Sequence, residues 1–308
     1  MHATLSSQVS KKLLMLLEES KNSTQNTQKN NRKLSNMLTF VPTPIGNLLD
    51  ISFRTLNVLK DAELILCEDT RVTKKLINLI DQKLDFKIPQ NKEFLSVHSH
   101  NEEKYISEQY IDIYKTKNVV YVSDAGMPCV SDPGAILVQA CIKHDISYDV
   151  LPGANALLTA YAMSGFNQKE FTFYGFLPHK TINRKSPLSD ILNSQYLTIL
   201  YESPHRIEQL LKEIQNLDDT KELFLVKELT KMYQRTFKGN ASSIIEQFKS
   251  SDIRGEWVVI VDSKESSKGE SITLEDLEDL KLPPKQKAKL IAKLTGQNVK
   301  DIYNQLTS

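Results

Sequence analysis

An apolar run that ends abruptly in a long polar loop constrains the fold of this chain more than any other segment. Val119–Val122 has a β-strand pattern, and residues 123–134 then read SDAGMPCVSDPG before a helical pattern begins. A strand, a loop and a helix in this order form the unit of an open parallel sheet, in which ligands bind beyond the carboxyl ends of the strands. Prolines stiffen the loop, and glycines allow close backbone approach. We therefore predict a small-molecule site here; an ordinary βα connection is the alternative.

The first half of the chain repeats this rhythm. We expect strands at Leu38–Pro42, Glu63–Cys67, Glu93–Val97, Val119–Val122 and Tyr148–Leu151. We expect helices at Ser52–Lys60, Thr70–Ile80, Glu102–Thr116 and Ile136–Lys143, and a buried one at Ala154–Met163. Either Asp50 or Ser52 suits the N-cap of the first helix. Alternating strands and helices predict an α/β fold with a parallel sheet and right-handed crossovers.

Beyond Gly165 the pattern changes and indicates a second domain. The expected strands are Phe171–Gly175, Leu197–Tyr201, Phe224–Lys227 and Trp257–Asp262, and the expected helices are Ile207–Ile214 and Ile244–Lys249. We predict an N-terminal α/β domain at 37–165 and a C-terminal mixed α/β domain at 166–262. Residues 263–308 should be a linker and a small helical tail, in which Leu282–Gln297 and Val299–Leu306 form a helix-turn-helix-like unit.

The ends of the chain and its bulk composition narrow the class of protein. Residues 1–36 are mostly polar and predict a disordered or poorly ordered extension, so Met37 is a candidate start. Net charge is +1, so any contact with nucleic acid must use local patches. The three cysteines form no CxxC pair, which favours a reducing compartment and disfavours a metal site. No segment is long and apolar enough to span a membrane, and the expected location is cytoplasmic.

Five motifs carry a family resemblance in this order along the chain. They are Phe40–Asp50, Ala62–Arg71, Ser123–Gly134 with Leu151–Ala156, Tyr201–Arg206, and Lys227–Lys231. Together they resemble the tetrapyrrole methylase superfamily, and within it the branch that methylates the ribose 2′-hydroxyl of a cytidine in 16S ribosomal RNA. The resemblance implies a two-domain tetrapyrrole-methylase-like fold, S-adenosyl-L-methionine as cofactor, ribosomal RNA of the small subunit as partner, and a homodimer.

The resemblance also implies which residues hold the cofactor, in a cleft between the two domains. They are Pro44, Gly46, Asp124, Ala125, Gly126, Met127, Pro128, Ser131, Glu228, Leu229 and Thr230. A carboxylate at Asp124 suits a ligand that carries an ammonium and a sulfonium. Gly46 is expected to supply a turn with positive φ. Asp132 is expected to cap the following helix rather than to bind the ligand.

Methyl transfer to a hydroxyl needs alignment and is helped by a general base. The catalytic candidates are Glu68, Asp69, Arg71, Glu202, His205 and Arg206, and Asp124, Glu228 and Lys231 are further candidates for the base. The sequence does not assign the base. The acids at 68–69 and Arg71 suit a ribose and a phosphate, although acids at a helix N-terminus are the structural alternative. We expect no metal, and a cleft-lining role for His98 and His100.

A basic loop after a strand of the second domain is a candidate RNA clamp, with Lys180, Arg184 and Lys185 as its contacts. The lysines of the tail are more simply explained as a solvated helical face. Two other functions stay open. One is a methyltransferase of the same fold that acts on a tetrapyrrole precursor. The other is a ribosome-assembly protein that binds RNA without catalysis.

Overall fold

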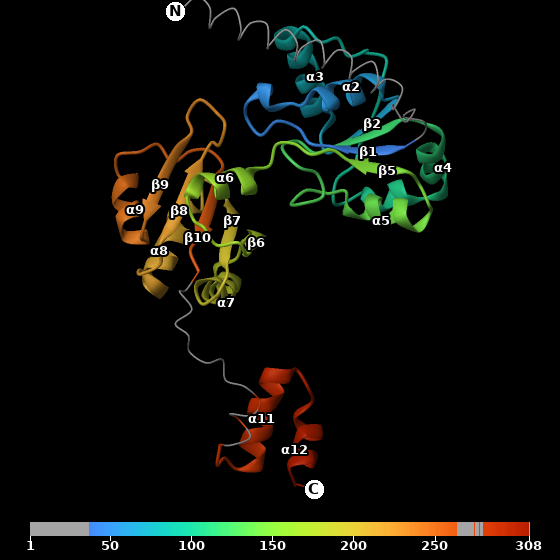
Figure 1. The fold of residues 1–308 in the computed structure, drawn as a ribbon. Helices are drawn as coiled ribbons and strands as arrows, with labels where there is room; N and C mark the ends of the chain where they lie inside the picture. Colours follow the sequence, from blue (N-terminus) through green and yellow to red (C-terminus); the bar gives the residue numbers. More distant parts are fainter. Residues whose placement is uncertain (1–36, 264–273, 275–276, 278–279, 308) are drawn as a thin grey trace, which may run out of the picture.

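The computed structural model describes residues 37–263, 274, 277 and 280–307, so the predicted N-terminal extension and most of the linker lie outside the described residues. The first domain contains β1 Leu38–Val41, η1 Leu48–Asp50, α2 Phe53–Asp61, β2 Leu64–Cys67, α3 Thr70–Leu84, β3 Glu93–Ser96, η2 Glu102–Ile106, α4 Glu108–Thr116, β4 Val119–Val122, α5 Ala135–Lys143 and β5 Tyr148–Val150. The rest contains α6 Ala156–Ser164, β6 Phe171–Phe176, α7 Thr181–Leu192, β7 Leu197–Glu202, α8 Ile207–Asp218, β8 Leu223–Lys227, β9 Arg235–Gly239, α9 Ala241–Phe248, β10 Trp257–Val261, α11 Pro284–Thr295 and α12 Val299–Thr307. Figure 1 shows two α/β bodies and a helical tail drawn apart from them.

The first sheet is parallel throughout, with strand order β3-β2-β4-β1-β5. The three central strands β1, β2 and β4 are buried along their whole length and almost entirely apolar, as strands covered on both faces require. Helices α2 and α3 pack on one face through Leu59 and Ile77, and α4 and α5 pack on the other through Tyr114 and Leu137. The predicted parallel α/β sheet is therefore confirmed, and the carboxyl ends of β1, β2 and β4 share one edge.

The second sheet is mixed, with order β6-β7-β10-β8-β9 and a parallel pair only at β6–β7. Helices α7, α8 and α9 cover one face. Helix α6 covers the other face together with Ile45 from the first domain. We expected α6 to be a buried helix that ends the first domain. It packs on the second sheet instead, and Leu158 on its outer side is 52% exposed.

Three further elements differ from the sequence prediction. The helix expected over Glu102–Thr116 is interrupted at Ser107, which separates η2 from α4. Strand β9 was not predicted because Phe237 is its only buried residue. Helix α7 occupies most of the segment that we expected to be a basic loop. Within the described residues, no helix has the length and the apolar character that crossing a membrane requires.

The tail forms the predicted pair of helices. Helix α11 ends at Gly296, which takes the left-handed conformation (φ 71°) that terminates helices, and α12 follows. Ala288, Ile291 and Ile302 form its small core together with Leu277. A helix pair of this size buries little apolar surface, and its lysines lie on the outside of this core.

Candidate active site

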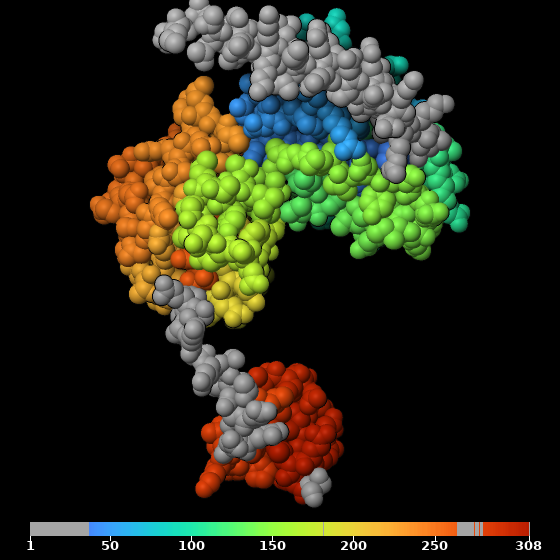
Figure 2. All heavy atoms as spheres, viewed as in Figure 1, coloured from blue at the N-terminus to red at the C-terminus, as the bar shows by residue number. Residues whose placement is uncertain are grey.

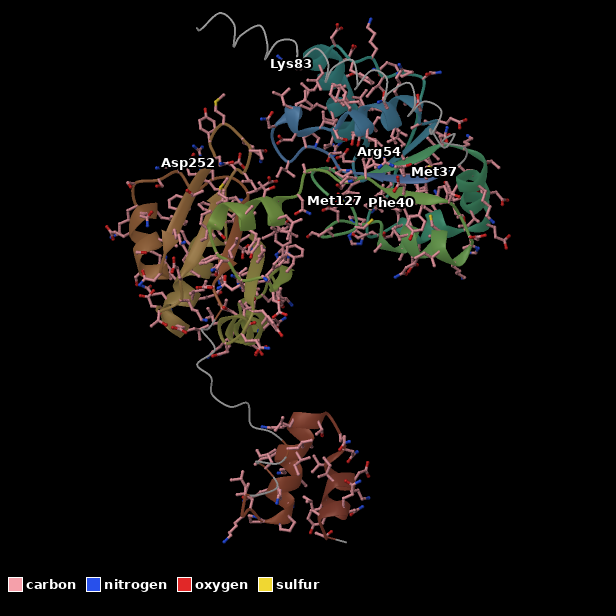
Figure 3. The ribbon with its side chains drawn as sticks, viewed as in Figure 1. Met37, Phe40, Arg54, Lys83, Met127 and Asp252 are labelled. Atoms are coloured by element: carbon pink, nitrogen blue, oxygen red, sulfur yellow. The ribbon has the colours of Figure 1, made fainter. Side chains whose placement is uncertain are left out.

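A cavity of about 470 Å³ lies between the first and second domains. Figure 2 shows the surface hollowed between the two bodies, and Figure 3 places Met127 on the side of the first domain that faces the second. The lining residues come from both domains. They are Ile45, Glu68, Asp124, Ala125, Gly126, Met127, Val130, Ser131, Asp132, Asn155, Ala156, Phe176, Tyr201, Glu202, Ser203, Pro204, Leu229, Glu256, Trp257 and Val258.

The loop after β4 forms one wall of the cavity, as its pattern predicts. The backbone amides of Thr43 and Gly126 each donate to the other residue's carbonyl oxygen at 3.0 Å, which ties this loop to the end of β1. Gly126 has φ 82°, a conformation that favours glycine. A Cβ atom there would lie 3.1 Å from Cγ2 of Ile45. The loop is therefore held by backbone contacts that leave its inner face open to a ligand.

The segment after β1 meets the second domain across a close contact at Gly46. A Cβ atom on Gly46 would lie 2.4 Å from Cγ of Lys231 and 2.7 Å from Oγ1 of Thr230. The amide of Asn47 donates to that Oγ1 at 3.1 Å. The predicted positive φ at Gly46 is wrong, because its φ is not in the left-handed region. The structure requires glycine at this position because Thr230 and Lys231 of the second domain leave no room for a side chain.

Three carboxylates at the cavity come from the carboxyl end of the first sheet: Glu68, Asp124 and Asp132. Burial raises the pKa of each of them, and the negative charge of Asp124 raises the pKa of Glu68 and Asp132 further. In the part of the chain that the structure describes, none of the three has an ion-pair partner. The expected capping role of Asp132 is wrong, because Gly134 (φ 118°) is the N-cap of α5.

Asp69 and Arg71 form a surface pair beside the cavity. Asp69 is the N-cap of α3 and accepts the amide of Arg71 at 2.8 Å, and its carboxylate accepts Nη2 of the same arginine at 2.6 Å. These hydrogen bonds lower the pKa of Asp69 to about 2. The Arg71 side chain is 88% exposed. Asp69 thus fills the structural role of a helix cap, and Arg71 is open to a partner from solvent.

The motif Tyr201–Arg206 at the end of β7 contains a buried glutamate that forms two ion pairs. Glu202 is 2% exposed and pairs with Arg206 at 2.7 Å and with Arg184 at 3.4 Å. Glu202, Ser203 and Pro204 line the cavity, whereas His205 and Arg206 do not. Both carboxylate oxygens of Glu202 are occupied by guanidinium groups, which leaves neither of them free to meet a substrate hydroxyl.

The loop after β8 supplies Leu229 to the cavity. Its neighbours Glu228 (φ 50°) and Thr230 (φ 65°) take left-handed conformations. Glu228 pairs with Lys231 at 2.9 Å, and the same lysine pairs with Glu256 at 2.8 Å. Burial opposes a low pKa at Glu228, but the hydrogen bond from Lys231 lowers it. Pro44, Gly46, Pro128, Glu228 and Thr230, which we expected at the cofactor, lie in or beside these wall-forming loops without lining the cavity.

The expected RNA contacts separate into two groups. Lys180 and Lys185 are exposed, but Arg184 is 1% exposed and pairs with Glu202 and Glu213. The prediction that Arg184 contacts RNA is therefore wrong: α7 turns its side chain into the domain. His98 and His100 do not line the cavity, so that expectation is wrong too. The described residues hold no cluster of three or more His, Cys, Asp or Glu side chains suited to a metal ion.

Several lining residues escaped the sequence prediction. Asn155 is the N-cap of α6, where its side chain accepts the amide of Leu158 at 3.0 Å. Phe176 is the last residue of β6 and Tyr201 the second-last residue of β7; both line the cavity, and their ring centroids are 5.6 Å apart. Burial raises the pKa of Tyr201 to about 12, so its hydroxyl is neutral. An aromatic residue at the end of an apolar run was the available signal for these two.

Comparison with known proteins gives consistent results. The family of Tetrapyrrole (Corrin/Porphyrin) Methylases matches residues 37–245. A Campylobacter fetus protein named ribosomal RNA small subunit methyltransferase I is 49% identical over 270 residues, which cover 88% of this chain and 99% of that protein. Proteins of the same name from Helicobacter pylori and Thermotoga maritima are 44% and 39% identical, and the matches cover 87% and 74% of this chain and 97% and 99% of those proteins.

Solved structures agree on the fold. A diphthine synthase gives a TM-score of 0.52 at 15% identity, covering 73% of this chain and 90% of that one. A cobalt precorrin-4 methyltransferase gives 0.51 at 17% identity, covering 73% of this chain and 94% of that one. At such identities the likeness concerns the two-domain architecture and not the substrate.

Proposed function

We propose that this chain, which belongs to the tetrapyrrole (corrin/porphyrin) methylase family, methylates the ribose 2′-hydroxyl of a cytidine in the 16S RNA of the small ribosomal subunit. Members of the family use S-adenosylmethionine. The observation that carries the proposal is the cavity between the domains, in which three carboxylates with no ion-pair partner among the described residues meet apolar and aromatic walls. The names of three relatives that match this chain over most of their length support RNA as the substrate.

The cavity fits the methyl donor in size and in chemistry. A volume of about 470 Å³ lies within the range of ordinary cofactor sites. The carboxylates of Glu68, Asp124 and Asp132 would attract the ammonium and sulfonium charges of the donor. Met127, Leu229 and Trp257 offer apolar surface for an adenine. When bound, S-adenosylmethionine supplies an electrophilic methyl group, and the walls would exclude water from it.

We propose Glu68 or Asp132 as the group that accepts the proton of the ribose hydroxyl. Both line the cavity, both lack a cation partner among the described residues, and burial raises the pKa of both toward the range that suits a general base. Arg71, Lys180 and Lys185 are exposed beside the cavity or on the adjoining domain and would contact RNA phosphates.

We also propose that the protein acts as a homodimer in the cytoplasm. Support for a second copy is a set of exposed apolar residues on η1, on the first turn of α2 and on the loop after β8: Leu49 (74% exposed), Phe53 (83%), Met232 (89%) and Tyr233 (71%). Exposed apolar residues of this kind mark interaction surfaces. Sedimentation equilibrium of the full chain tests this assignment, and a monomer at micromolar concentration would contradict it.

The decisive experiment combines two measurements on the full chain. Calorimetry with S-adenosylmethionine comes first, followed by transfer of a labelled methyl group to purified small subunits that lack the modification. A porphyrinogen serves as the competing acceptor. We expect donor binding and label in the ribose of a 16S RNA cytidine. Label in the porphyrinogen alone would favour tetrapyrrole methylation, and RNA binding without donor binding would favour an assembly protein.

A further inference from the structure

A buried ionic network joins three elements of the second domain beside the cavity. Glu202 ends β7, and its two carboxylate oxygens accept from Arg184 on α7 and from Arg206 at the N-cap of α8. Oε1 of Glu202 also accepts the amide of Ser203 at 2.8 Å. Arg184 continues the network to Glu213 on α8 at 3.1 Å. One carboxylate thus fixes two helices and the first residue of the cavity wall.

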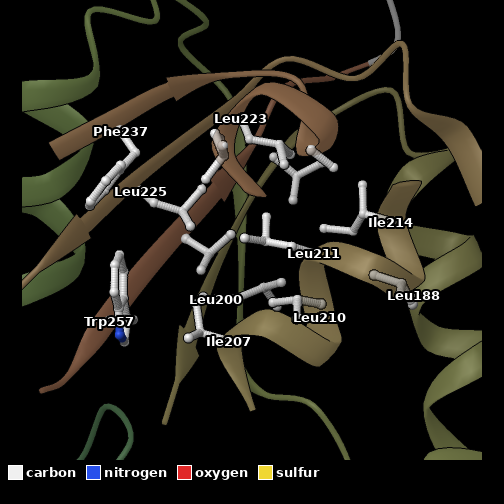
Figure 4. Close-up of a cluster of buried hydrophobic side chains, with 14 of the residues drawn as sticks. Leu188, Leu200, Ile207, Leu210, Leu211, Ile214, Leu223, Leu225, Phe237 and Trp257 are labelled. Atoms are coloured by element: carbon white, nitrogen blue, oxygen red, sulfur yellow. The ribbon is translucent and has the colours of Figure 1, made fainter. Parts of the chain in front are cut away.

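This ionic network is a poor way to increase the free energy of unfolding. Arg184 is 1% exposed, and its Nη2 atom is buried with no hydrogen-bond partner in the part of the chain that the structure describes. A buried guanidinium with an unused donor costs free energy, and a well-packed apolar pair at such a place is often as stable. The surrounding core already packs closely, because Leu188 of α7 and Leu210 and Ile214 of α8 meet in one cluster (Figure 4). Unfavourable local choices of this kind are typical of functional sites.

The second guanidinium reaches out of the network to a surface loop. Nη1 of Arg206 donates to the carbonyl oxygen of Leu177 at 3.3 Å and lies 3.3 Å from Nδ1 of His179. That loop begins directly after Phe176, which lines the cavity, and ends at the exposed Lys180. Glu202 therefore holds the arginine that holds the loop, and the same carboxylate holds the cavity wall through Ser203.

We propose that Glu202 is a positioning residue, which fixes loop 177–180 relative to the wall Ser203–Pro204 through Arg206. The role rests on the proposed RNA methylation, because the loop carries Lys180 to the RNA while the wall borders the donor cavity. Alignment of an acceptor hydroxyl behind a methyl group tolerates little displacement, and an error of about 1 Å can cost roughly 100-fold in rate. Glu202 acts in this way without contact with the reacting atoms.

Matched substitutions separate positioning from stability. Glu202→Gln and Glu213→Gln each remove one ion pair from Arg184, but Glu213 does not line the cavity and does not pair with Arg206. Arg206→Lys keeps the charge and loses the guanidinium that contacts Glu202 and Leu177 together. The measurements are single-turnover methyl transfer to small subunits at saturating donor, donor affinity by calorimetry, melting temperature, and hydrogen exchange of the backbone amides of Leu177, His179 and Lys180.

We expect Glu202→Gln and Arg206→Lys to lower the single-turnover rate about 10- to 100-fold. The double variant should be no slower than either single variant, because both break one connection. Exchange of the loop amides should rise in both, and donor affinity should stay within about threefold. Glu213→Gln should keep the wild-type rate and loop exchange. Equal rate losses in Glu202→Gln and Glu213→Gln that follow the melting temperatures would overturn the proposal. Because loop exchange needs no RNA, a failure of the proposed RNA substrate would leave that readout intact.

Discussion

Replacing Gly46 with alanine tests whether the two domains must touch for the methyl donor to bind. The added Cβ atom would lie 2.4 Å from Cγ of Lys231, 2.7 Å from Oγ1 of Thr230 and 3.0 Å from the carbonyl oxygen of Leu229. The lysine side chain can move, whereas the backbone carbonyl cannot move alone. Overpacking typically costs about 1–3 kcal/mol. The contact joins two domains, so the strain is most simply relieved by widening the cavity between them.

The cost should therefore fall on donor affinity rather than on the core of either domain. Since about 1.4 kcal/mol corresponds to a factor of ten, the dissociation constant should rise roughly 5- to 140-fold. Calorimetry of Gly46→Ala gives this value directly. Gly165→Ala is the matched control, because Gly165 has φ 72° and no atom lies within 4 Å of its added Cβ. Alanine at Gly165 therefore strains the backbone, but at a position remote from the contact between Gly46 and the second domain. Wild-type affinity in Gly46→Ala, or an equal loss in Gly165→Ala, would refute the reasoning.

Three other predictions concern the loop after β4, the basic side chains and the buried acids. Gly126→Val places a β-branched residue at φ 82° and should abolish donor binding in calorimetry while circular dichroism stays unchanged. Replacing Lys180 and Lys185 with alanine should flatten the salt dependence of RNA binding by about one unit of slope per phosphate contact, whereas Arg184→Ala should lower the melting temperature. Burial raises the pKa of Glu68, so ionisation opposes folding: as pH rises from the unfolded value of about 4.3 through the folded one, the wild type should lose stability relative to Glu68→Gln in melting curves.

The parallel sheet could be predicted because its signal is local. Val119–Val122 forms β4 with the predicted limits, since a strand buried on both faces is apolar throughout. Strand β9 could not be found in this way: it lies at the sheet edge and buries Phe237 alone. Helix α7 contains Pro187 and several polar residues, and its position is fixed by packing of Leu188 and by the ion pairs of Arg184. Such partners come from distant parts of the chain.

In the candidate site, too, features with a local sequence signal could be predicted, and features that depend on distant residues could not. The loop at 123–134 could be recognised because strand, turn residues and helix follow one another directly. The pairing of Glu202 with Arg184 could not, because Arg184 lies 18 residues before it in the sequence and on α7, a helix that the sequence did not predict. Gly46 was predicted to have a positive φ, whereas the structure needs a glycine there because Lys231 lies too close for a side chain. The sequence around Gly46 could not predict this contact, because Lys231 is distant in the chain.

Pairing also decides which acids can take part in proton transfer, and neighbouring residues can differ completely. Glu68 lines the cavity, and burial beside Asp124 raises its pKa. Asp69, the next residue, does not line the cavity, and its hydrogen bonds with Arg71 lower its pKa to about 2. With so low a pKa, the Asp69 carboxylate is ionised and has little affinity for a proton. Its structural role is that of the N-cap of α3. Burial instead raises the proton affinity of Glu68, one of the two acids that we propose as the general base. The two acids at the end of β2 thus differ in proton affinity, because Asp69 pairs with Arg71 whereas Glu68 has no ion pair among the described residues.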